Sequence, residues 1–527
     1  MLSKNNYIAI FTLTFLFFFL LPILVPFDLW DGVIISYASE LNDLSGIKFW
    51  FFSSGWHLQY FQISLFHWIS SNILIDFLLL NKIINYLFSV IFIREVCLIG
   101  SKLIKLESNW VSLLALFLAS SPVFSVLSSS VMTFHFLSLT ICLVGVRFFH
   151  TNHATQQIIG LLLILLSLSY PANLGLCIGI SFLNDCCKSK KKSDFAFLSI
   201  RTIVVSILAI SFYFVQGLLF DPYGFWEGYY SIRNPFTLKG ILVIGFRSIE
   251  YISHFILIVI PILLFLLINY SREDLLYKPN IKKILGLGVL LASSCLSFIL
   301  VGKSASIIDI YDWSTRHVLT FYTPFSLILI YILRELYVSQ ISHASLIKVI
   351  IGLPIIFNIV LGGYSWNDKF QRADFYKTFI EFAKQNPSKF ESQFVIIERD
   401  MKPSIRSYEY NYLYFIANSN NNTFISESKF SLDNALKKIS QEKLGFSQTE
   451  IIAFQNFAPN EKINYLKENK PSLLKTLEMY FIADLREWDT NNTINDPSLR
   501  KWYGSEPGIK LKRNLREIAN DLFNENQ

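Results

Sequence analysis

Two aspartates just after the first apolar run are the residues best suited to acid–base chemistry. Asp28 and Asp31 are three residues apart in the segment Phe27-Asp28-Leu29-Trp30-Asp31. In a helical turn, this spacing puts both carboxylates on one face. A carboxylate can accept the proton of an attacking hydroxyl, so either aspartate is a candidate general base. The alternative is ordinary interfacial polarity or capping of the next helix, because one short acidic spacing has low specificity.

A second set of candidates is basic and precedes a late apolar segment. Lys303 and Arg316, followed by His317, stand in the sequence VGKSASIIDIYDWSTRHVLTFYTPF. A cation at the mouth of a helix, opposite a carboxylate, can bind a lipid phosphate while the carboxylate activates a hydroxyl. Alternatively, Arg316 is an anchor whose side chain reaches from a helix end to the membrane surface.

Other kinds of site have no signature in the sequence. It contains no Walker A loop, no GxGxxG or HExxH motif, and no Asp-x-Asp pair. The six cysteines lie in or beside apolar segments, without disulfide or zinc-site spacing. A cytosolic nucleotide-dependent enzyme and a cysteine-bound zinc site are therefore not indicated.

The composition separates an apolar part of the chain from a polar part. Of the 527 residues, 53% are hydrophobic and 16% are charged, whereas globular chains average about 45–50% and about 25%. Residues 1–362 contain 40 charged side chains, and residues 363–527 contain 45. This predicts a polytopic membrane domain followed by a water-soluble domain. Most of the net charge of +7 lies between the apolar segments, so nucleic acid is not expected as a partner.

The apolar segments predict eleven transmembrane helices, the first of them retained and not cleaved as a signal peptide. A break at Pro171 separates two short spans and keeps the following lysine run in the cytosol. With a cytosolic N-terminus, 14 basic residues fall on the cytosolic side and seven on the other, outside the tail. The C-terminal domain is then extracytoplasmic. The predicted spans are 7–27, 84–104, 110–124, 131–149, 158–170, 172–185, 197–217, 253–270, 284–301, 317–336 and 345–362.

Two regions outside the spans have predicted structure. The first outer loop, 27–83, is rich in Trp, Phe and Tyr and predicts helices lying in the membrane interface, because structureless loops of this length are uncommon. The C-terminal domain contains strand-like runs, and its other segments favour a mixed α/β or mostly helical fold. The strand-like runs are 394–397 and 423–425, and the helical segments are 404–418, 433–443, 461–481 and 511–524.

The order of these features resembles that of the GT-C glycosyltransferases, integral membrane enzymes that use polyprenyl-phosphate sugars. The segments LLLNKIINYLFSVIFIREVCLIGSKLIK and SLLALFLASSPVFSVLSSSVMTFHFLSL resemble their second to fourth spans. The segment STRHVLTFYTPFSLILIYIL resembles a late span with an arginine and a proline. Within the superfamily, the membrane part is most similar to bacterial O-antigen-modifying glucosyltransferases of the serotype-converting type. The resemblance does not cover the C-terminal domain.

The resemblance implies roles for the candidate residues. An acidic residue of the first outer loop is the expected catalytic base; Asp28 and Asp31 match it, and Glu40 is a third candidate. Asp28 is favoured because it is closest to the rigid end of the first helix.

The expected contact with the donor phosphate is a basic residue before a late span. Arg316 matches it, with Lys303 and His317 as helpers and Arg247 as a further candidate. A divalent ion, Mg²⁺ or Mn²⁺, is a candidate cofactor without an identified ligand set.

The function implied is transfer of a sugar, with glucose expected, from a polyprenyl-phosphate donor to a lipid-linked polysaccharide such as O-antigen. The reaction would invert the anomeric centre. It would take place on the periplasmic side of the bacterial inner membrane, which the C-terminal domain also faces. The alternatives are a transporter or flippase for lipid-linked saccharides and a polysaccharide polymerase. The large outer loop, the outer domain and the few mid-membrane charges weigh against a transporter.

Overall fold

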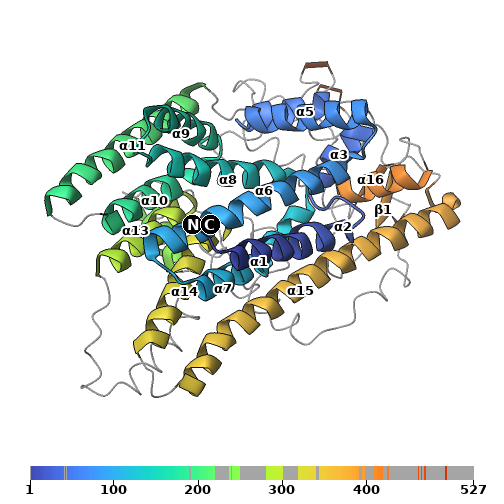
Figure 1. Ribbon diagram of the computed structural model, residues 1–527. Helices are drawn as coiled ribbons and strands as arrows, with labels where there is room; N and C mark the ends of the chain where they lie inside the picture. Colours follow the sequence, from blue (N-terminus) through green and yellow to red (C-terminus); the bar gives the residue numbers. More distant parts are fainter. Residues whose placement is uncertain are drawn as a thin grey trace. The chain divides into compact units, whose positions relative to one another are not determined.

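The computed structural model describes a mainly helical chain (Figure 1). It divides into two compact units, Met1–Ala373 and Asp374–Gln527. The described residues are 2–40, 42, 44–188, 192–219, 237–238, 240–249, 281–300, 318–339, 344–390, 394–397, 407–418, 424–426, 493–494 and a few positions between 461 and 469. The candidates Lys303, Arg316 and His317 lie outside them, as do the predicted span 253–270 and the predicted helices 433–443 and 511–524.

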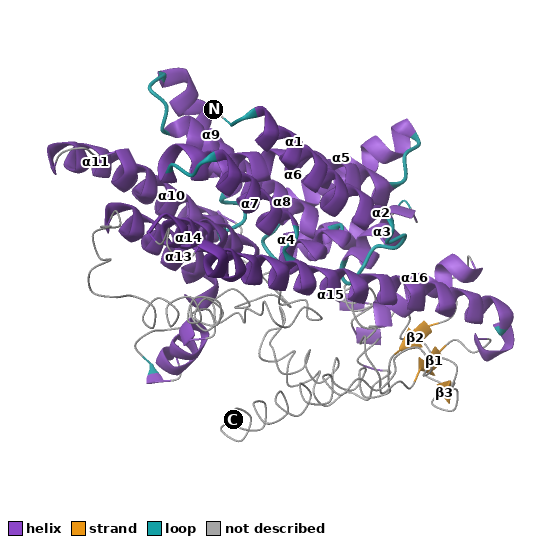
Figure 2. Cartoon of the chain, turned by 60° about the horizontal axis from the view of Figure 1, so that its bottom comes forward, coloured by secondary structure: helices purple, strands orange, loops and turns teal. Residues whose placement is uncertain are grey.

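The first unit is built of helices, drawn in two views in Figures 1 and 2. The last of them, α15, is long and continues into the second unit. The elements are α1 (Lys4–Thr14), the π-helix η1 (Phe15–Leu20), α2 (Leu21–Ile23), α3 (Gly32–Glu40), α4 (Ser45–Ser53), α5 (His57–Ile73), α6 (Phe77–Ile99), the π-helix η2 (Gly100–Ile104), α7 (Ser108–Ala119), the 3₁₀-helix η3 (Pro122–Ser128), α8 (Val131–Phe149), α9 (Ala154–Ser167), α10 (Asn173–Lys188), α11 (Lys192–Leu219), α13 (Ile281–Leu300), α14 (Leu319–Ser339) and α15 (Ala344–Gln385).

Four helical segments of the described part are long and apolar enough to cross a membrane. They are Lys4–Ile23, Phe77–Ile104, Val131–Phe149 and Lys282–Leu300. A fifth results if α7 and η3, which meet at a bend of 51°, form one span. The chain is therefore an α-helical protein with four or five candidate membrane spans among the described residues, and the total of eleven stays a prediction.

Several predicted helix boundaries are confirmed, and others differ from those in the structure. The span 131–149 coincides with α8, and the break at Pro171 is present because α9 ends at Ser167 and α10 begins at Asn173. The segment 110–124 is not one straight helix, because α7 ends at Ala119 and Pro122, which has no backbone N–H to donate, opens η3.

The long first loop is also helical, as expected. It contains α3, α4 and α5, and α5 leaves Phe61, Leu65 and Trp68 exposed. Exposed apolar side chains of this size are typical of contact with lipid. That these helices lie in the interface plane stays a prediction.

Close contacts between helices hold the first unit together. A Cβ atom added at Gly175 of α10 would lie 1.7 Å from the carbonyl oxygen of Ser293 on α13, so the two backbones touch. Small residues permit such close approach in membrane helices. Elsewhere four aromatic rings join η1, α6, η3 and α8, with centroids 5.2 to 6.1 Å apart. They belong to Phe18, Phe92, Phe124 and Phe136.

Buried polar contacts fix the middle of α15 to the other helices of the first unit. Asn358 Nδ2 donates to Ser120 Oγ at 3.0 Å, and Asn358 Oδ1 accepts a hydrogen bond from the hydroxyl of Tyr322. Further along α15, Ser365 Oγ donates to the carbonyl oxygen of Pro122 at 3.3 Å. The α15 residues just after Ser365 are therefore held in a defined position.

The second unit contains a small parallel sheet, shown in orange in Figure 2. Its order is β2-β1-β3, with Val395 opposite Ile425. The predicted strands at 394–397 and 423–425 are confirmed, the second shifted by one residue, and the predicted helix 404–418 is present as α16. Because α16 lies between β1 and β2 in sequence, it provides the crossover that parallel neighbours need. The elements are η7 (Pro387–Phe390), β1 (Phe394–Ile397), α16 (Ser407–Asn418), β2 (Phe424–Ser426) and β3 (Thr493–Ile494).

Candidate active site in the first loop

The two aspartates of the first loop lie in a tight turn that leads into α3. The turn is not helical at its centre, because Trp30 has a φ of 52°, in the left-handed region. A bulky residue in this region costs of the order of 1–3 kcal/mol and persists only where its surroundings hold it. Asp28 and Asp31 are therefore not on one face of a regular helix, and the turn is a strained feature that neighbouring elements maintain.

Asp28 is wholly buried and accepts hydrogen bonds from three directions. Its Oδ1 accepts the backbone N–H of Leu29 at 3.0 Å and that of Ser130 at 2.9 Å. Its Oδ2 accepts the hydroxyl of Ser36 at 2.7 Å. Burial raises the pKa of this carboxyl above its usual range, although these hydrogen bonds act in the opposite direction. Since Ser130 is the residue before α8, Asp28 ties the turn to the N-terminal end of that helix.

Further contacts lock the same two chain segments together. The hydroxyl of Ser129 donates to the carbonyl oxygen of Leu29 at 2.6 Å. From α5, Gln59 Nε2 donates to the carbonyl oxygen of Val131 at 2.9 Å. The turn, the start of α8 and α5 thus form one hydrogen-bonded assembly, which gives the site rigid support.

Gly32 is the residue against which Asp28 packs, and replacing it gives a direct test of this assembly. A Cβ atom at this position would lie 2.0 Å from Asp28 Oδ1 and 2.5 Å from Ser129 Oγ. We expect Gly32→Ala to destabilise the protein by about 1–3 kcal/mol, because the carboxylate of Asp28 must move away from the groups that donate hydrogen bonds to it. The measurement is thermal unfolding in detergent. Gly363→Ala is the matched control, since a Cβ there meets nothing within 4 Å; equal effects at both positions would contradict the packing described.

A buried cation lies near Asp28. Lys82, on the first turns of α6, is 5% exposed, and its ammonium donates to the carbonyl oxygen of Val25 at 2.5 Å. The negative charges of Asp28 and Asp76 both act on it. A buried lysine is usually paired or hydrogen-bonded, and Lys82 has both a hydrogen-bond acceptor and nearby carboxylates.

Two more cations, both from α15, lie over the ring of Trp30. The Nζ atom of Lys369 is 4.4 Å from the ring centroid, and Cζ of Arg372 is 5.4 Å from it. Both side chains are buried, at 1% and 3% exposure, and Lys369 forms an ion pair of 2.7 Å with Asp368. Desolvated cations over an indole gain about 2 kcal/mol or more. Trp30, the strained residue of the turn, is thus held by a pair of cations from α15.

The other predicted site residues of the described part lie in different surroundings. Asp31 is half-buried, unlike Asp28. Glu40 is exposed at the end of α3. Burial of Tyr37 and, to a smaller extent, the negative charge of Glu40 raise the pKa of Tyr37 to about 12. Arg247 lies 5.4 Å from the ring centroid of Phe246. The structure brings Asp28 and Asp31 into one turn, but it does not test their pairing with Arg316.

The cations of this site are the residues that sequence reasoning missed. Lys82 is one of the seven basic residues predicted on the outer side of the membrane, and Lys369 and Arg372 fall within the predicted water-soluble domain, 363–527. One signal could have found the latter two: they are three residues apart, so they share a face if the last predicted span continues as a helix. It does continue, as α15.

A divalent ion was a candidate cofactor. Among the described residues no group of three His, Cys, Asp and Glu side chains is placed to hold a metal ion. Asp28 already accepts three hydrogen bonds, and Asp31 is the remaining carboxylate of the turn. The need for Mg²⁺ or Mn²⁺ stays a prediction.

Comparisons with known proteins give no neighbour. No protein-family model, no curated protein and no solved structure matches this chain.

Proposed function

We propose that the chain is an integral membrane glycosyltransferase of the GT-C type. It transfers a sugar, glucose in our proposal, from a polyprenyl-phosphate donor to a lipid-linked polysaccharide such as O-antigen. The reaction takes place on the periplasmic side of the bacterial inner membrane. The observation that supports this most is the strained acidic turn beside two buried cations, in a chain whose described residues include four or five candidate spans.

The roles of the two aspartates follow from their burial. The hydroxyl oxygen of the acceptor attacks the anomeric carbon, a carboxylate takes the hydroxyl proton, and the lipid phosphate leaves with the bonding electrons. An acceptor can reach the half-buried Asp31, whereas Asp28 is wholly buried with its oxygens engaged. We therefore assign the base to Asp31 and the positioning of the turn to Asp28, although Asp28 is closer to the first helix.

The cations provide the complementary charge. The leaving phosphate carries negative charge, which fixed cations in a site with little water stabilise strongly. In the described part, Lys369 and Arg372 are the basic residues that lie over the ring of Trp30. Trp30 directly precedes Asp31 in the sequence. Arg316, with Lys303 and His317, keeps the role that the resemblance implies. A divalent ion, where bound, would add charge stabilisation at the phosphate.

Sugar transfer by the purified protein in detergent tests the proposal. With a polyprenyl-phosphate sugar and a lipid-linked acceptor we expect a glycosidic product and inversion at the anomeric carbon. A flippase would move the saccharide across vesicle membranes and give no product. A polymerase would extend the acceptor by repeat units and not by one sugar, so either result would replace the proposal.

The predicted topology gives a second test. Asn72 is exposed at the end of α5 in the predicted outer loop, and Lys188 is exposed at the end of α10 on the predicted cytosolic side. In a background without native cysteines, we expect Asn72→Cys to react with an impermeant thiol reagent in intact cells and Lys188→Cys to be protected. Labelling at Lys188→Cys with protection at Asn72→Cys would invert the topology and place the acidic turn in the cytosol.

A further inference from the structure

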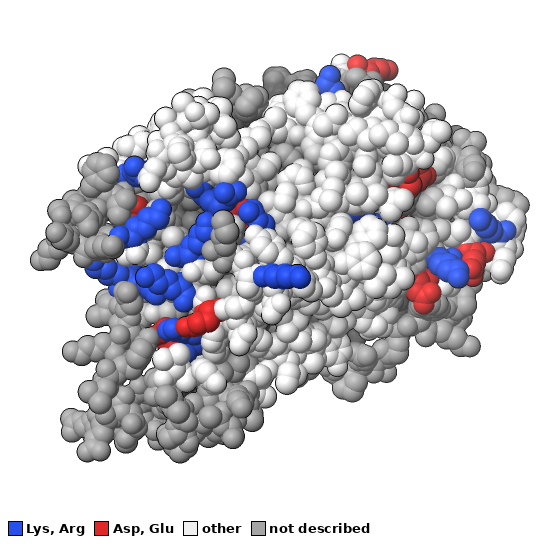
Figure 3. Space-filling view, viewed as in Figure 1, with Lys and Arg blue, Asp and Glu red and all other residues white. Residues whose placement is uncertain are grey.

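A surface rich in lysine lies in the first unit, away from the residues of the acidic turn in sequence. On the face drawn in Figure 3, Lys and Arg side chains gather at the left, where Figure 1 has α10 and α13. We call this the basic surface. It comprises Lys102, Lys105, Lys188, Arg201, Lys282 and Lys283, which come from η2, the residue after it, α10, α11 and α13.

These cations lie close enough to act on one another. Lys188 interacts electrostatically with Arg201 and Lys102. Lys283 interacts with Lys105, and both act on the thiol of Cys187. Four separate chain segments thus bring like charges together, which is unfavourable unless an anion compensates for them.

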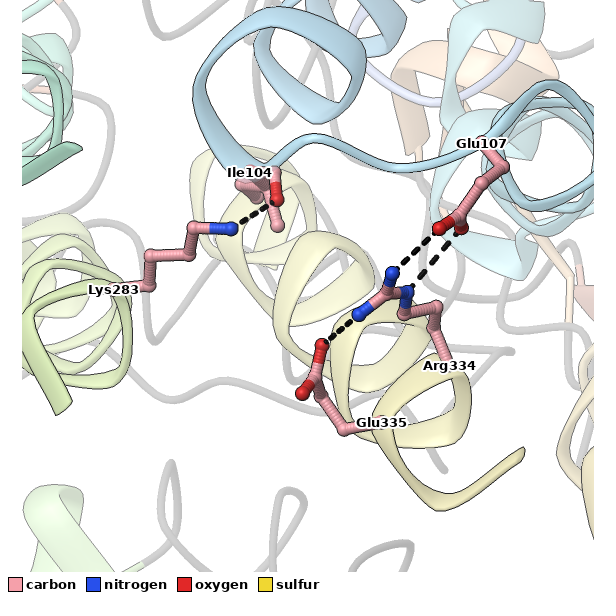
Figure 4. Close-up of polar contacts among 5 residues, drawn as sticks. All are labelled: Ile104, Glu107, Lys283, Arg334 and Glu335. Atoms are coloured by element: carbon pink, nitrogen blue, oxygen red, sulfur yellow. Dashed lines mark hydrogen bonds and ion pairs between the residues drawn. The ribbon is translucent and has the colours of Figure 1, made fainter. Parts of the chain in front are cut away.

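The carboxylates nearby offset part of this positive charge: Asp185 acts on Lys188 and Arg201, and Glu335 acts on Lys283. As Figure 4 shows, Arg334 binds Glu107 through two hydrogen bonds of 2.5 and 3.2 Å and binds Glu335 at 2.6 Å. These bonds from Arg334 are the main cause that lowers the pKa of Glu107. In the same view Lys283 donates to the carbonyl oxygen of Ile104 at 2.7 Å. The Oδ2 atom of Asp185 also accepts a hydrogen bond from the hydroxyl of Thr202.

Lys102 and Lys105 differ from Lys283 because they are exposed. In the described part of the chain neither of them forms an ion pair. Among the described residues, this surface therefore carries more positive charge than its carboxylates balance.

The position of the cations along the candidate spans fixes their depth. Lys102 is in the last turn of the span Phe77–Ile104, and Lys282 is the first residue of the span Lys282–Leu300. Both are therefore at span ends, at the level of the lipid headgroups. Each lysine at that level raises the affinity for an anionic lipid by about fivefold.

We propose that the basic surface binds the phosphate of an anionic phospholipid headgroup, such as that of phosphatidylglycerol. This site is separate from the acidic turn and does not depend on the function proposed for it. The ammonium groups of Lys102 and Lys105, at the end of the span Phe77–Ile104, and of Lys188, at the end of α10, are all exposed and surround one phosphate as point charges.

The test is lipid binding by the purified full-length protein after delipidation, followed by native mass spectrometry. Phosphatidylglycerol is titrated against phosphatidylcholine of the same chain length. We expect the wild type to prefer phosphatidylglycerol and Lys102→Gln/Lys105→Gln to bind it about tenfold or more weakly. Lys102→Arg/Lys105→Arg should restore binding, because it keeps the charge. Lys377→Gln/Lys384→Gln, which removes two exposed charges of α15, should bind like the wild type.

Four outcomes contradict the proposal. They are equal binding of both lipids, equal binding of phosphatidylglycerol by wild type and double variant, displacement by equimolar inorganic phosphate, and a preference for polyprenyl phosphate. The last two would make the surface a site for free phosphate or for a donor lipid. Thermal unfolding of each variant checks its fold, and Lys188→Gln is an independent second variant if the double variant does not fold.

Discussion

Asp31→Asn is expected to reduce sugar transfer by about 10²–10⁴-fold without loss of stability. The amide nearly keeps the volume of the carboxylate but cannot take a proton from the acceptor. Because Asp28 accepts the buried hydrogen bonds of the turn and Asp31 is only half-buried, the change leaves those bonds intact. Transfer rate and thermal unfolding in detergent must be measured on the same preparation.

Two substitutions of Asp28 give the matched comparison. In Asp28→Asn the amide oxygen can accept both backbone N–H groups, and the Ser36 hydroxyl can rotate to accept from the amide nitrogen. We expect this variant to remain folded and to lose only a few-fold in rate. Asp28→Ala leaves the buried N–H groups of Leu29 and Ser130 without an acceptor, which costs about 1–3 kcal/mol for each group.

The opposite effects of the two Asn substitutions would identify Asp28 as the catalytic base. A stable Asp28→Asn protein without activity, together with a fully active Asp31→Asn protein, would show that the acceptor reaches the buried carboxylate. If both Asn variants are stable and active, the acidic turn has no catalytic role, and Glu40 becomes the next candidate.

Several local elements of the described part were predictable from the sequence. The span 131–149 and the strand 394–397 coincide with α8 and β1, and the break at Pro171 is confirmed. These features depend on short-range causes, namely the length of an apolar run, β-branched residues and a proline.

The composition of the candidate site was predictable only in part. The acidic turn was visible because both aspartates are in one short segment, but the φ of Trp30 was not. The cations from α15 are more than 330 positions away along the chain, and only tertiary packing brings them to Trp30. The sequence also suggested a soluble tail from residue 363, whereas α15 continues through that position to Gln385.

The cations of α15 give the second large expected effect. We expect Arg372→Gln to lower the rate of transfer by about 10²–10³-fold, because a fixed positive charge near the leaving phosphate is lost. Arg372→Lys should recover part of the rate, since an ammonium keeps the charge but not the two-pronged geometry of the guanidinium. Lys377→Gln, an exposed position further along α15, is the control and should be unchanged.

A purely structural role of Arg372 makes a different prediction. If its guanidinium only supports the ring of Trp30, Arg372→Gln lowers the unfolding temperature, and the rate per folded molecule stays near that of the wild type. If it acts on the phosphate, the rate per folded molecule falls and the KM for the donor rises, while the KM for the acceptor does not change. Arg316→Ala belongs in the same series, because a loss confined to that variant would move the phosphate site from α15 to the segment before α14.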